Sequence, residues 1–363
     1  MTRLAVDLGV LTCPERAIDL SPADWNRLLP VLRANALTAR LASDLAGARL
    51  SRSLPPAVRR QFAADLYLAR QHQTVIHNEI AAVHTALADA GIPFLLLKGA
   101  GYLASGVDAG RGRLFEDIDV LVRPERLDRA EAALLRGGWA AERLAAYDER
   151  YYREWMHQVP PLIHVHRQSV VDLHHGLVPR TSRLRVDAEA LWAHARPVPG
   201  LAQAYVPHPA DLLLHAAVHA LTQEDVSSAL RDLVDMHRLL REFADDRVFR
   251  DRLACHGANA DAGATLALAR DLLDTVLGAS PPPAVTHVIP PGGRGHTVRL
   301  RVMRRAIRPE APPSLLQRGA RLVVFLRGHF LKMPVGLLLR HIWMKLARGG
   351  DNRDRGAGDT ARV

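Results

Sequence analysis

The sequence predicts an α+β fold, in which a small mixed β-sheet core lies between an N-terminal helical arm and a C-terminal helical domain. Apolar residues recur every three or four positions on both sides of a central region, which is typical of amphipathic helices. The central region instead holds short, unbroken apolar runs bounded by turn residues, the pattern of buried strands. In the whole chain 48% of the residues are hydrophobic and 24% are charged, which is typical of a globular protein.

The N-terminal helical region is expected over residues 1–91. Its last helix is the clearest, because one face of the segment "AVRRQFAADLYLARQHQTVIHNEIAAVHTALADAG" is apolar at helical spacing and Gly91 follows as a terminator. The residues of that face are Phe62, Leu66, Ala69, Ile76, Ile80, Val83 and Leu87.

The sheet core is expected over residues 92–200. Buried strands are predicted in "IPFLLLK" and "DIDVLV", and two more in "PLIHVHRQSVVDLHHGL", with a turn around Arg167 and Gln168. A glycine turn and the short helix "AGYLASGV" separate the first two strands. A longer helix in "RPERLDRAEAALLRGGW" follows the second, with proline near its start and glycines at its end.

Helices are expected again over residues 201–280, then a Pro/Gly-rich linker over 281–296 and a basic helical tail over 297–363. From His296 onward the chain has fifteen Lys and Arg against four acids, so the tail carries the excess charge of the protein. Such a tail suits an anionic membrane surface, a biosynthetic partner or simply a solvated helix face. Its most apolar part is interrupted by charges and by Pro334, so it cannot span a bilayer.

The two cysteines, Cys13 and Cys255, exclude a disulfide framework and a cysteine-rich zinc site. The N-terminus carries three acids within its first nineteen residues and lacks a continuous apolar run, so a secretory signal is not expected. We therefore predict a cytoplasmic protein. Its basic tail would also allow peripheral binding at the inner face of the membrane.

Acidic residues in two predicted strands indicate a metal site. In Asp117-Ile118-Asp119 both carboxylates project from the same face of a strand, where they repel unless a divalent cation lies between them. Two exposed aspartates at the start of a strand are the ordinary alternative. However, a third acid, Asp172, stands inside another apolar run, where a plain core strand has no use for a charge. Three such carboxylates match the needs of two-metal phosphoryl transfer.

A phosphate-binding turn is predicted just upstream of these acids. The apolar strand ends at Lys98, one of only three lysines in the chain, and Gly99-Ala100-Gly101 then lead into a helix. A strand, a glycine turn and a helix N-terminus together can lay backbone N–H groups against a phosphate. Arg111 and Arg113, shortly before the aspartates, either add phosphate contacts or solvate the loop.

These motifs together resemble the nucleotidyltransferase superfamily with a polymerase-beta-like core, and in particular a bacterial family of uncharacterised nucleotidyltransferases. The motifs are K-G before a helix, G-R before D-I-D, and V-D-L-H about fifty residues later, and the similarity covers roughly residues 60–245. The resemblance implies a nucleotidyltransferase core, with Asp117 and Asp119 as metal ligands and Asp172 as the third carboxylate. It also implies that Lys98, Gly99 and Arg113 bind the phosphates. His219, Arg231 and Asp235 fall at polar positions of the family without an assigned role.

One position departs from the wider superfamily. Its usual turn is Gly-Ser, whose hydroxyl holds a phosphate, whereas Ala100 follows Gly99 here. Lys98 then substitutes for the hydroxyl, or the activity is altered or lost.

Other site classes are set aside. A zinc site built from His164, His166 and His174 is not needed, because the aspartates already explain the acids. His215 and His219 lack the glutamate of H-E-x-x-H. Neither G-x-S-x-G nor a Walker P-loop occurs. Nucleic acid is not the expected partner, because aromatic residues make up only 5% of the chain.

The sequence therefore predicts an enzyme that depends on Mg²⁺ or Mn²⁺ and transfers a nucleoside monophosphate from an NTP to an unidentified small molecule, peptide or protein, releasing pyrophosphate. The alternative is a catalytically degenerate protein of the same fold that acts as a binding or scaffold module through its basic tail. Neither the base of the NTP nor the acceptor can be read from the residues.

Overall fold

The computed structural model describes residues 6–141, 152–153, 155–310, 312–334 and 336. Its helices are α1 (Pro22–Ala34), α2 (Thr38–Gly47), α3 (Pro56–Ala88), α4 (Lys98–Ser105), α5 (Leu127–Arg136), α7 (Glu189–Trp192), α8 (Pro209–Thr222), α9 (Ala229–Phe243), α10 (Arg247–Ala258), α11 (Ala260–Leu272), α12 (Pro283–Thr286), α13 (His296–Ile307) and α14 (Leu315–Lys332). Its strands are β1 (Phe94–Leu96), β2 (Ile118–Leu121), β3 (Trp139–Ala141), β4 (Leu162–His164), β5 (Val170–His174), β6 (Arg196–Pro197) and β7 (Ala204–Val206).

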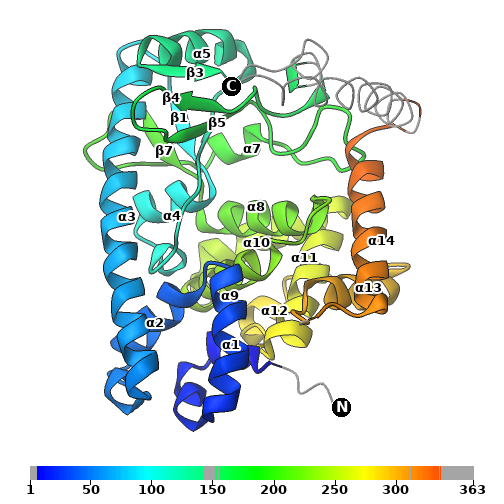
Figure 1. Cartoon of the computed structure of the whole chain (residues 1–363). Helices are drawn as coiled ribbons and strands as arrows, with labels where there is room; N and C mark the ends of the chain where they lie inside the picture. The colour runs from blue at the N-terminus through cyan, green and yellow to red at the C-terminus, as the bar shows by residue number, and fades with distance from the viewer. Residues whose placement is uncertain (1–5, 142–151, 154, 311, 335, 337–363) are drawn as a thin grey trace, which may run out of the picture.

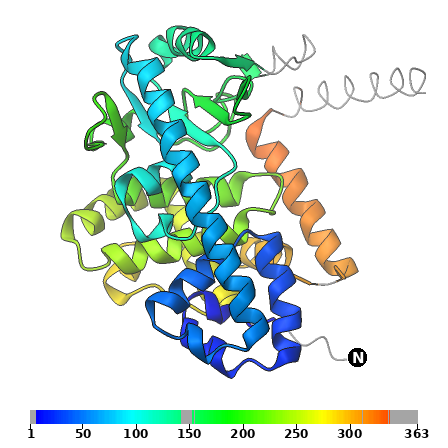
Figure 2. The same cartoon turned by 60° about the vertical axis from the view of Figure 1, so that its left-hand side comes forward.

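The N-terminal arm is helical, as predicted, and its last helix connects the two halves of the molecule. Ser21 and Asp24 form a capping box that fixes the start of α1. With 33 residues, α3 is about 50 Å long. Phe62, near its start, packs in the core of the helical part, whereas Ile80, near its end, packs against the sheet. Figures 1 and 2 show α3 running alongside both parts.

The strands form one mixed sheet in the order β3-β4-β5-β2-β1-β7-β6. β2 pairs parallel with β5 and antiparallel with β1, and β1 pairs parallel with β7. The predicted turn before β5 is present, with Gln168 in the left-handed region. A single mixed sheet flanked by helices confirms the predicted α+β class.

The two faces of the sheet have different neighbours. Phe94, Leu96, Ile118 and Val120 belong to the core that α3 and α5 cover. Because side chains alternate along a strand, Asp119 lies on the opposite face, together with Leu121. In Figure 1 this sheet lies at one end of the molecule, and α8 and α9 lie between it and the N-terminal helices. The acidic positions of β2 are therefore set between the sheet and the helical part.

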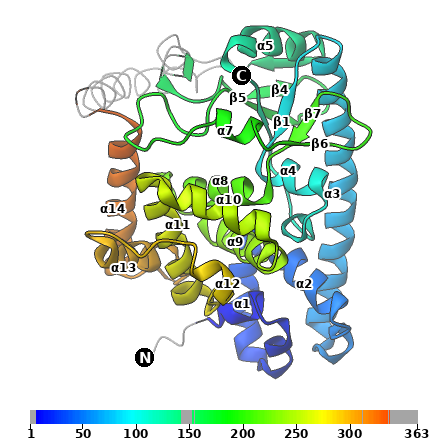
Figure 3. The same cartoon turned by 180° about the vertical axis from the view of Figure 1, so that it is seen from behind.

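The helical part has one apolar core that includes the arm, α8 to α11 and the C-terminal helices. In the segment predicted as a linker, α12 and the residues after it pack on this core through Val285 and Ile289, both almost fully buried. α13 contacts α11 and α14, and α14 contacts α8, as the view from behind shows (Figure 3). The domain boundaries stay a prediction, but the described C-terminal helices are part of the packed body.

None of the described helices is long and apolar enough to cross a membrane.

Candidate active site

Acidic side chains from β2 and β5 meet at the face of the sheet opposite α3. Asp119 and Asp172 are Cα partners in the parallel pairing of these strands. One ligand atom from each of Asp119, Asp172 and His174 lies within 4.8 Å of the others. Asp117 immediately precedes β2, and its pKa responds to the charges of both other aspartates. The structure thus brings together the three carboxylates that the sequence singled out.

The carboxylates of this cluster differ in their pKa values. Asp119 is only 2% exposed. Its Oδ1 lies 2.8 Å from Nζ of Lys98 and 2.9 Å from Nε2 of His174. Burial alone would raise the pKa of Asp119, but these two partners lower it well below its usual value. The charge of Asp119, followed by burial, raises the pKa of Asp117 to about 7. Burial and the same charge raise the pKa of Asp172.

This arrangement fits a divalent cation. The donor set of carboxylate oxygens and one imidazole nitrogen is one that Mn²⁺ accepts readily, and the carboxylates alone suit Mg²⁺. The raised pKa values of Asp117 and Asp172 report an excess of negative charge that a cation would neutralise. Asp117, Asp119, Asp172 and His174 are the residues that would hold it.

His174 was not expected in the site. The signal was present, because His174 stands two residues after Asp172 and therefore shares its face of the strand. His164, considered with it for a zinc site, instead packs edge-on against Trp139. Only His174 of that group joins the acidic cluster among the described residues.

Lys98 stands at the junction of β1 and α4, in a backbone conformation that side chains rarely adopt, with φ of +40°. Its ammonium group is aimed at Asp119. Burial acts to lower the pKa of Lys98, but the charges of Asp119, Asp117 and Asp172 together raise it. The next residue must be glycine, because a Cβ at Gly99 would lie 2.3 Å from the ring of Phe115. Phe115 in turn stacks on His72 of α3. The first turn of α4 therefore packs closely against the Phe115 ring, which stacks on α3.

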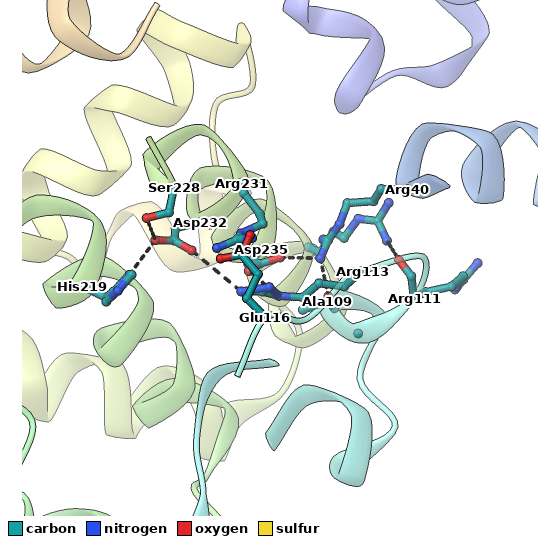
Figure 4. Close-up of polar contacts among 12 residues, drawn as sticks. Arg40, Ala109, Arg111, Arg113, Glu116, His219, Ser228, Arg231, Asp232 and Asp235 are labelled. Atoms are coloured by element: carbon teal, nitrogen blue, oxygen red, sulfur yellow. Dashed lines mark hydrogen bonds and ion pairs between the residues drawn. The ribbon is translucent and has the colours of Figure 1, made fainter. Parts of the chain in front are cut away.

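Arg113 lies deep in a chain of alternating charges, shown in Figure 4. Its Nε lies 3.2 Å from Asp235, and its terminal nitrogen lies 3.9 Å from Asp232. Asp235 also lies 2.6 Å from a guanidinium nitrogen of Arg40, which is fully buried on α2. The chain of charges therefore connects the N-terminal arm to the candidate site. The phosphate contact predicted for Arg113 stays a prediction, since its guanidinium already has acidic partners.

Two cavities adjoin the carboxylates. The walls of the first include Gly99, Arg113, Glu116, Ser228 and Arg231. The walls of the second include Asp172, His157, His215, Glu224 and Lys332. Both cavities are also lined by Lys98, Asp117 and His219. Asp119 lines the first cavity, Asp172 the second and Asp117 both, so the candidate metal ligands border two cavities that could each take one substrate.

The sequence assigned no role in the site to the residues that α8, α9 and α14 bring to these walls, although His219 and Arg231 were noted as polar positions of the family. His215 and His219 lie one helical turn apart on α8, and Arg231 lies on α9. Lys332 comes from the end of α14 and donates to Gln223 and Glu224. Their contribution depends on how distant segments pack, which leaves no local spacing to detect.

A family model described as an uncharacterised nucleotidyltransferase matches residues 21–274 of the chain. The match runs from the start of α1 through α11 and ends before α12, so it includes the sheet and both acidic strands. No curated protein and no solved structure matches the chain.

Proposed function

Because the chain belongs to the uncharacterised nucleotidyltransferase family, we propose that it transfers a nucleoside monophosphate from an NTP to an acceptor and releases pyrophosphate. The observation that carries this proposal is the meeting of Asp117, Asp119 and Asp172 where they line two adjoining cavities. In such a reaction the acceptor attacks the α-phosphorus of the NTP while the bond to pyrophosphate breaks. The two substrates must therefore reach one point from opposite sides.

The cavity lined by Gly99 and Arg231 suits the phosphates of the NTP. The first turn of α4 presents backbone N–H groups there, as the N-terminus of a helix does for an anion. Arg231 adds a cation whose side chain is 14% exposed and whose ion-pair partner, the exposed Glu116, lies 3.4 Å away. Ser228 supplies a hydroxyl group at the same cavity, which offsets the loss of the serine that Ala100 replaces.

The cavity lined by Asp172 and Lys332 suits the acceptor. Glu224 already neutralises Lys332, so this cavity offers little free positive charge to a phosphorylated acceptor. His157 and His215 are buried, and burial lowers the pKa of each well below its usual value, so both rings are neutral. Neutral imidazoles with the amides of Gln158 and Gln223 favour an uncharged hydroxyl group.

A divalent cation, when bound by the carboxylates, would neutralise charge on the phosphates and lower the pKa of the acceptor hydroxyl. The protein's own residues position the reactants. Lys98 and His174 fix one oxygen of Asp119, which leaves the other oxygen of that carboxylate for a ligand. We propose the cytoplasm as the site of this reaction, since free thiols at Cys13 and Cys255 suit a reducing compartment.

Isothermal titration of the protein with each of the four NTPs, in the presence of Mg²⁺ or Mn²⁺, tests this function. We expect saturable binding of at least one NTP and its loss in Asp117→Asn/Asp119→Asn. The matched control is Asp251→Asn, because Asp251 is a solvent-exposed carboxylate on α10. Equal binding by wild type and the double variant, or no binding by either, would count against the proposal. Mass spectrometry of a lysate incubated with mixed NTPs would then identify the modified acceptor.

A second candidate, a binding role for the C-terminal helices, rests on the surface of α14. Leu315, Leu322 and Leu326 are each more than half exposed on it, with exposed arginines at 318 and 321 between them. We propose that this basic, apolar face binds an anionic lipid surface, because both its charge and its side chains complement one. A catalytically degenerate scaffold protein would keep this property without nucleotide transfer.

Vesicle sedimentation distinguishes this second role. Full-length protein should pellet with vesicles that contain phosphatidylserine and stay in solution with phosphatidylcholine alone. Leu322→Glu/Leu326→Glu should abolish pelleting, whereas Val248→Glu, at an exposed position of α10, should not. If the double variant pelleted as wild type does, α14 would have no such role.

A further inference from the structure

His219 and Asp232 form a hydrogen-bonded pair beside the carboxylate cluster. Nδ1 of His219, near the end of α8, lies 2.8 Å from Oδ2 of Asp232 on α9 (Figure 4). Asp232 is 4% exposed and also accepts from the hydroxyl of Ser228. Burial acts to raise the pKa of Asp232, yet His219 and Arg113 lower it to about 2, so the carboxylate is ionised.

An ionised carboxylate only accepts hydrogen bonds, so Nδ1 of His219 must carry the proton that it donates. In the neutral ring this leaves the lone pair on Nε2. Within the described part of the chain, Nε2 makes no hydrogen bond to another protein group. Asp232 therefore holds His219 in the tautomer that can accept a proton at Nε2.

His219 stands where such an acceptor would be needed. It lines both cavities together with Lys98 and Asp117, and its side chain is 20% exposed. His215, one turn earlier on the same helix, lines only the second cavity and is 4% exposed. In the proposed reaction, the hydroxyl group from the second cavity and the phosphorus atom from the first would meet beside these shared residues.

We propose that Nε2 of His219 accepts the proton of the acceptor hydroxyl as its oxygen attacks the α-phosphorus of the NTP. This inference rests on the proposed nucleotidyl transfer. The oxygen forms the new bond to phosphorus, the bond to pyrophosphate breaks, and pyrophosphate leaves with that electron pair. The proton moves to His219, whose imidazolium form Asp232 stabilises, and then passes to solvent. Asp232 is thus a positioning residue.

The pair has an alternative reading as a structural contact between α8 and α9. The two roles predict different effects when His219 is replaced. A structural contact contributes to stability, and no external base can replace it. A proton acceptor contributes mainly to kcat, by 10²- to 10⁴-fold for a general base, and a diffusible base can take its place.

The test uses the full chain, the four NTPs with Mn²⁺, and molar glycerol as the hydroxyl acceptor, with pyrophosphate release and the glycerol adduct as readouts. His219→Gln should bind NTP within twofold of wild type, keep its melting temperature, and lose at least a hundredfold in kcat. Asp232→Asn should lose at least tenfold. Added imidazole should raise the rate of His219→Ala. The matched control is His77→Gln, because His77 on α3 is exposed and bonds only within its helix.

Pyrophosphate release by His219→Gln within threefold of wild type would overturn the inference and leave the proposed function standing. A His219→Ala variant that imidazole does not rescue would likewise overturn it, in favour of the structural reading. A wild-type protein that binds NTP but releases no pyrophosphate would overturn the transfer itself, and the role of His219 with it.

Discussion

Nζ of Lys98 and Nε2 of His174 meet at the same oxygen of Asp119, at 2.8 and 2.9 Å. The lysine that the sequence assigned to phosphate binding is therefore also the partner of a candidate metal ligand. Its side chain is 17% exposed at the edge of both cavities, so it can still approach a phosphate there. Lys98 balances part of the negative charge of the cluster before any cation binds.

This pairing predicts the effect of Lys98→Met. The substitution leaves Asp119 buried with only one donor, and removal of one partner of a buried pair costs about 3–5 kcal/mol. Since Lys98 is at the edge of the cavities, we expect the lower end of this range for the metal-free protein. Added Mn²⁺ should restore more of the melting temperature in the variant than in wild type, because the cation replaces the missing charge. Thermal unfolding with EDTA or Mn²⁺ measures both effects, and an equal response of the two proteins to Mn²⁺ would contradict the pairing.

The opposite effect is predicted for Asp117→Asn. The pKa of Asp117 is about 7 in the folded protein, above the unfolded value of 3.8, mainly because of the charge of Asp119. A raised carboxyl pKa means that stability is lost as the pH rises from about 4 through 7. Asn removes this cost, so the metal-free variant should be more stable than wild type by about 1–3 kcal/mol at pH 8.

The gain from Asp117→Asn should shrink as the pH falls from 8 to 5, where the wild-type carboxyl is protonated. Urea unfolding with EDTA at pH 5, 6.5 and 8 measures this dependence. Asp251→Asn is the control, because this carboxylate is exposed on α10. If Asp117→Asn were less stable than wild type at pH 8, the charge of Asp117 would not destabilise the metal-free protein.

Much of the fold could be predicted because it has local signals. The apolar stripe of α3, the short runs that became β1, β2 and β5, and the helix that follows β1 all depend on residues close in sequence. The glycines predicted as a turn before that helix instead lie in its first turn, since α4 begins at Lys98. The acidic cluster could be anticipated for the same reason. Once Asp119 and Asp172 are placed on strands, only the pairing of β2 with β5 is needed to bring them together.

The rest of the site has no local signal. The contacts of Arg113 depend on the approach of α9, 119 to 122 residues later in the chain, whose Asp232 and Asp235 surround its guanidinium. Lys332 enters the second cavity only because α14 packs against α8. The function of His219 likewise depends on its hydrogen bond to a neighbouring helix. Sequence spacing identifies groups on one element but not the partners that determine what they do.

Gly99→Ala tests how tightly the first turn of α4 packs against Phe115. The new Cβ would lie 2.3 Å from the Phe115 ring, which His72 prevents from moving away. We expect a loss of about 1–3 kcal/mol in stability, as for other overpacked sites, and at least tenfold weaker NTP binding, because the backbone of α4 must shift. The control is Gly47→Ala, where the nearest atom lies 3.8 Å away. If Gly99→Ala matched this control in thermal unfolding and NTP titration, the turn would not be constrained.

Arg113 and Arg231 line the same cavity but should respond differently to replacement by methionine. The Arg113 side chain is 6% exposed, and its loss would leave Asp235 with Arg40 as its remaining ion-pair partner among the described residues. Arg113→Met should therefore destabilise the protein by about 3–5 kcal/mol. The Arg231 side chain is 14% exposed, and its ion-pair partner, Glu116, is itself 77% exposed, so this pair contributes little to stability. Arg231→Met should unfold within about 1 kcal/mol of wild type, yet bind NTP at least tenfold more weakly if its charge faces the phosphates. Urea unfolding and NTP titration of the two variants side by side separate these effects.

A strong loss of stability in Arg231→Met, or unchanged NTP affinity, would show that Arg231 does not bind the phosphates. Lys98, which lines the same cavity, would then be the cation expected to bind them.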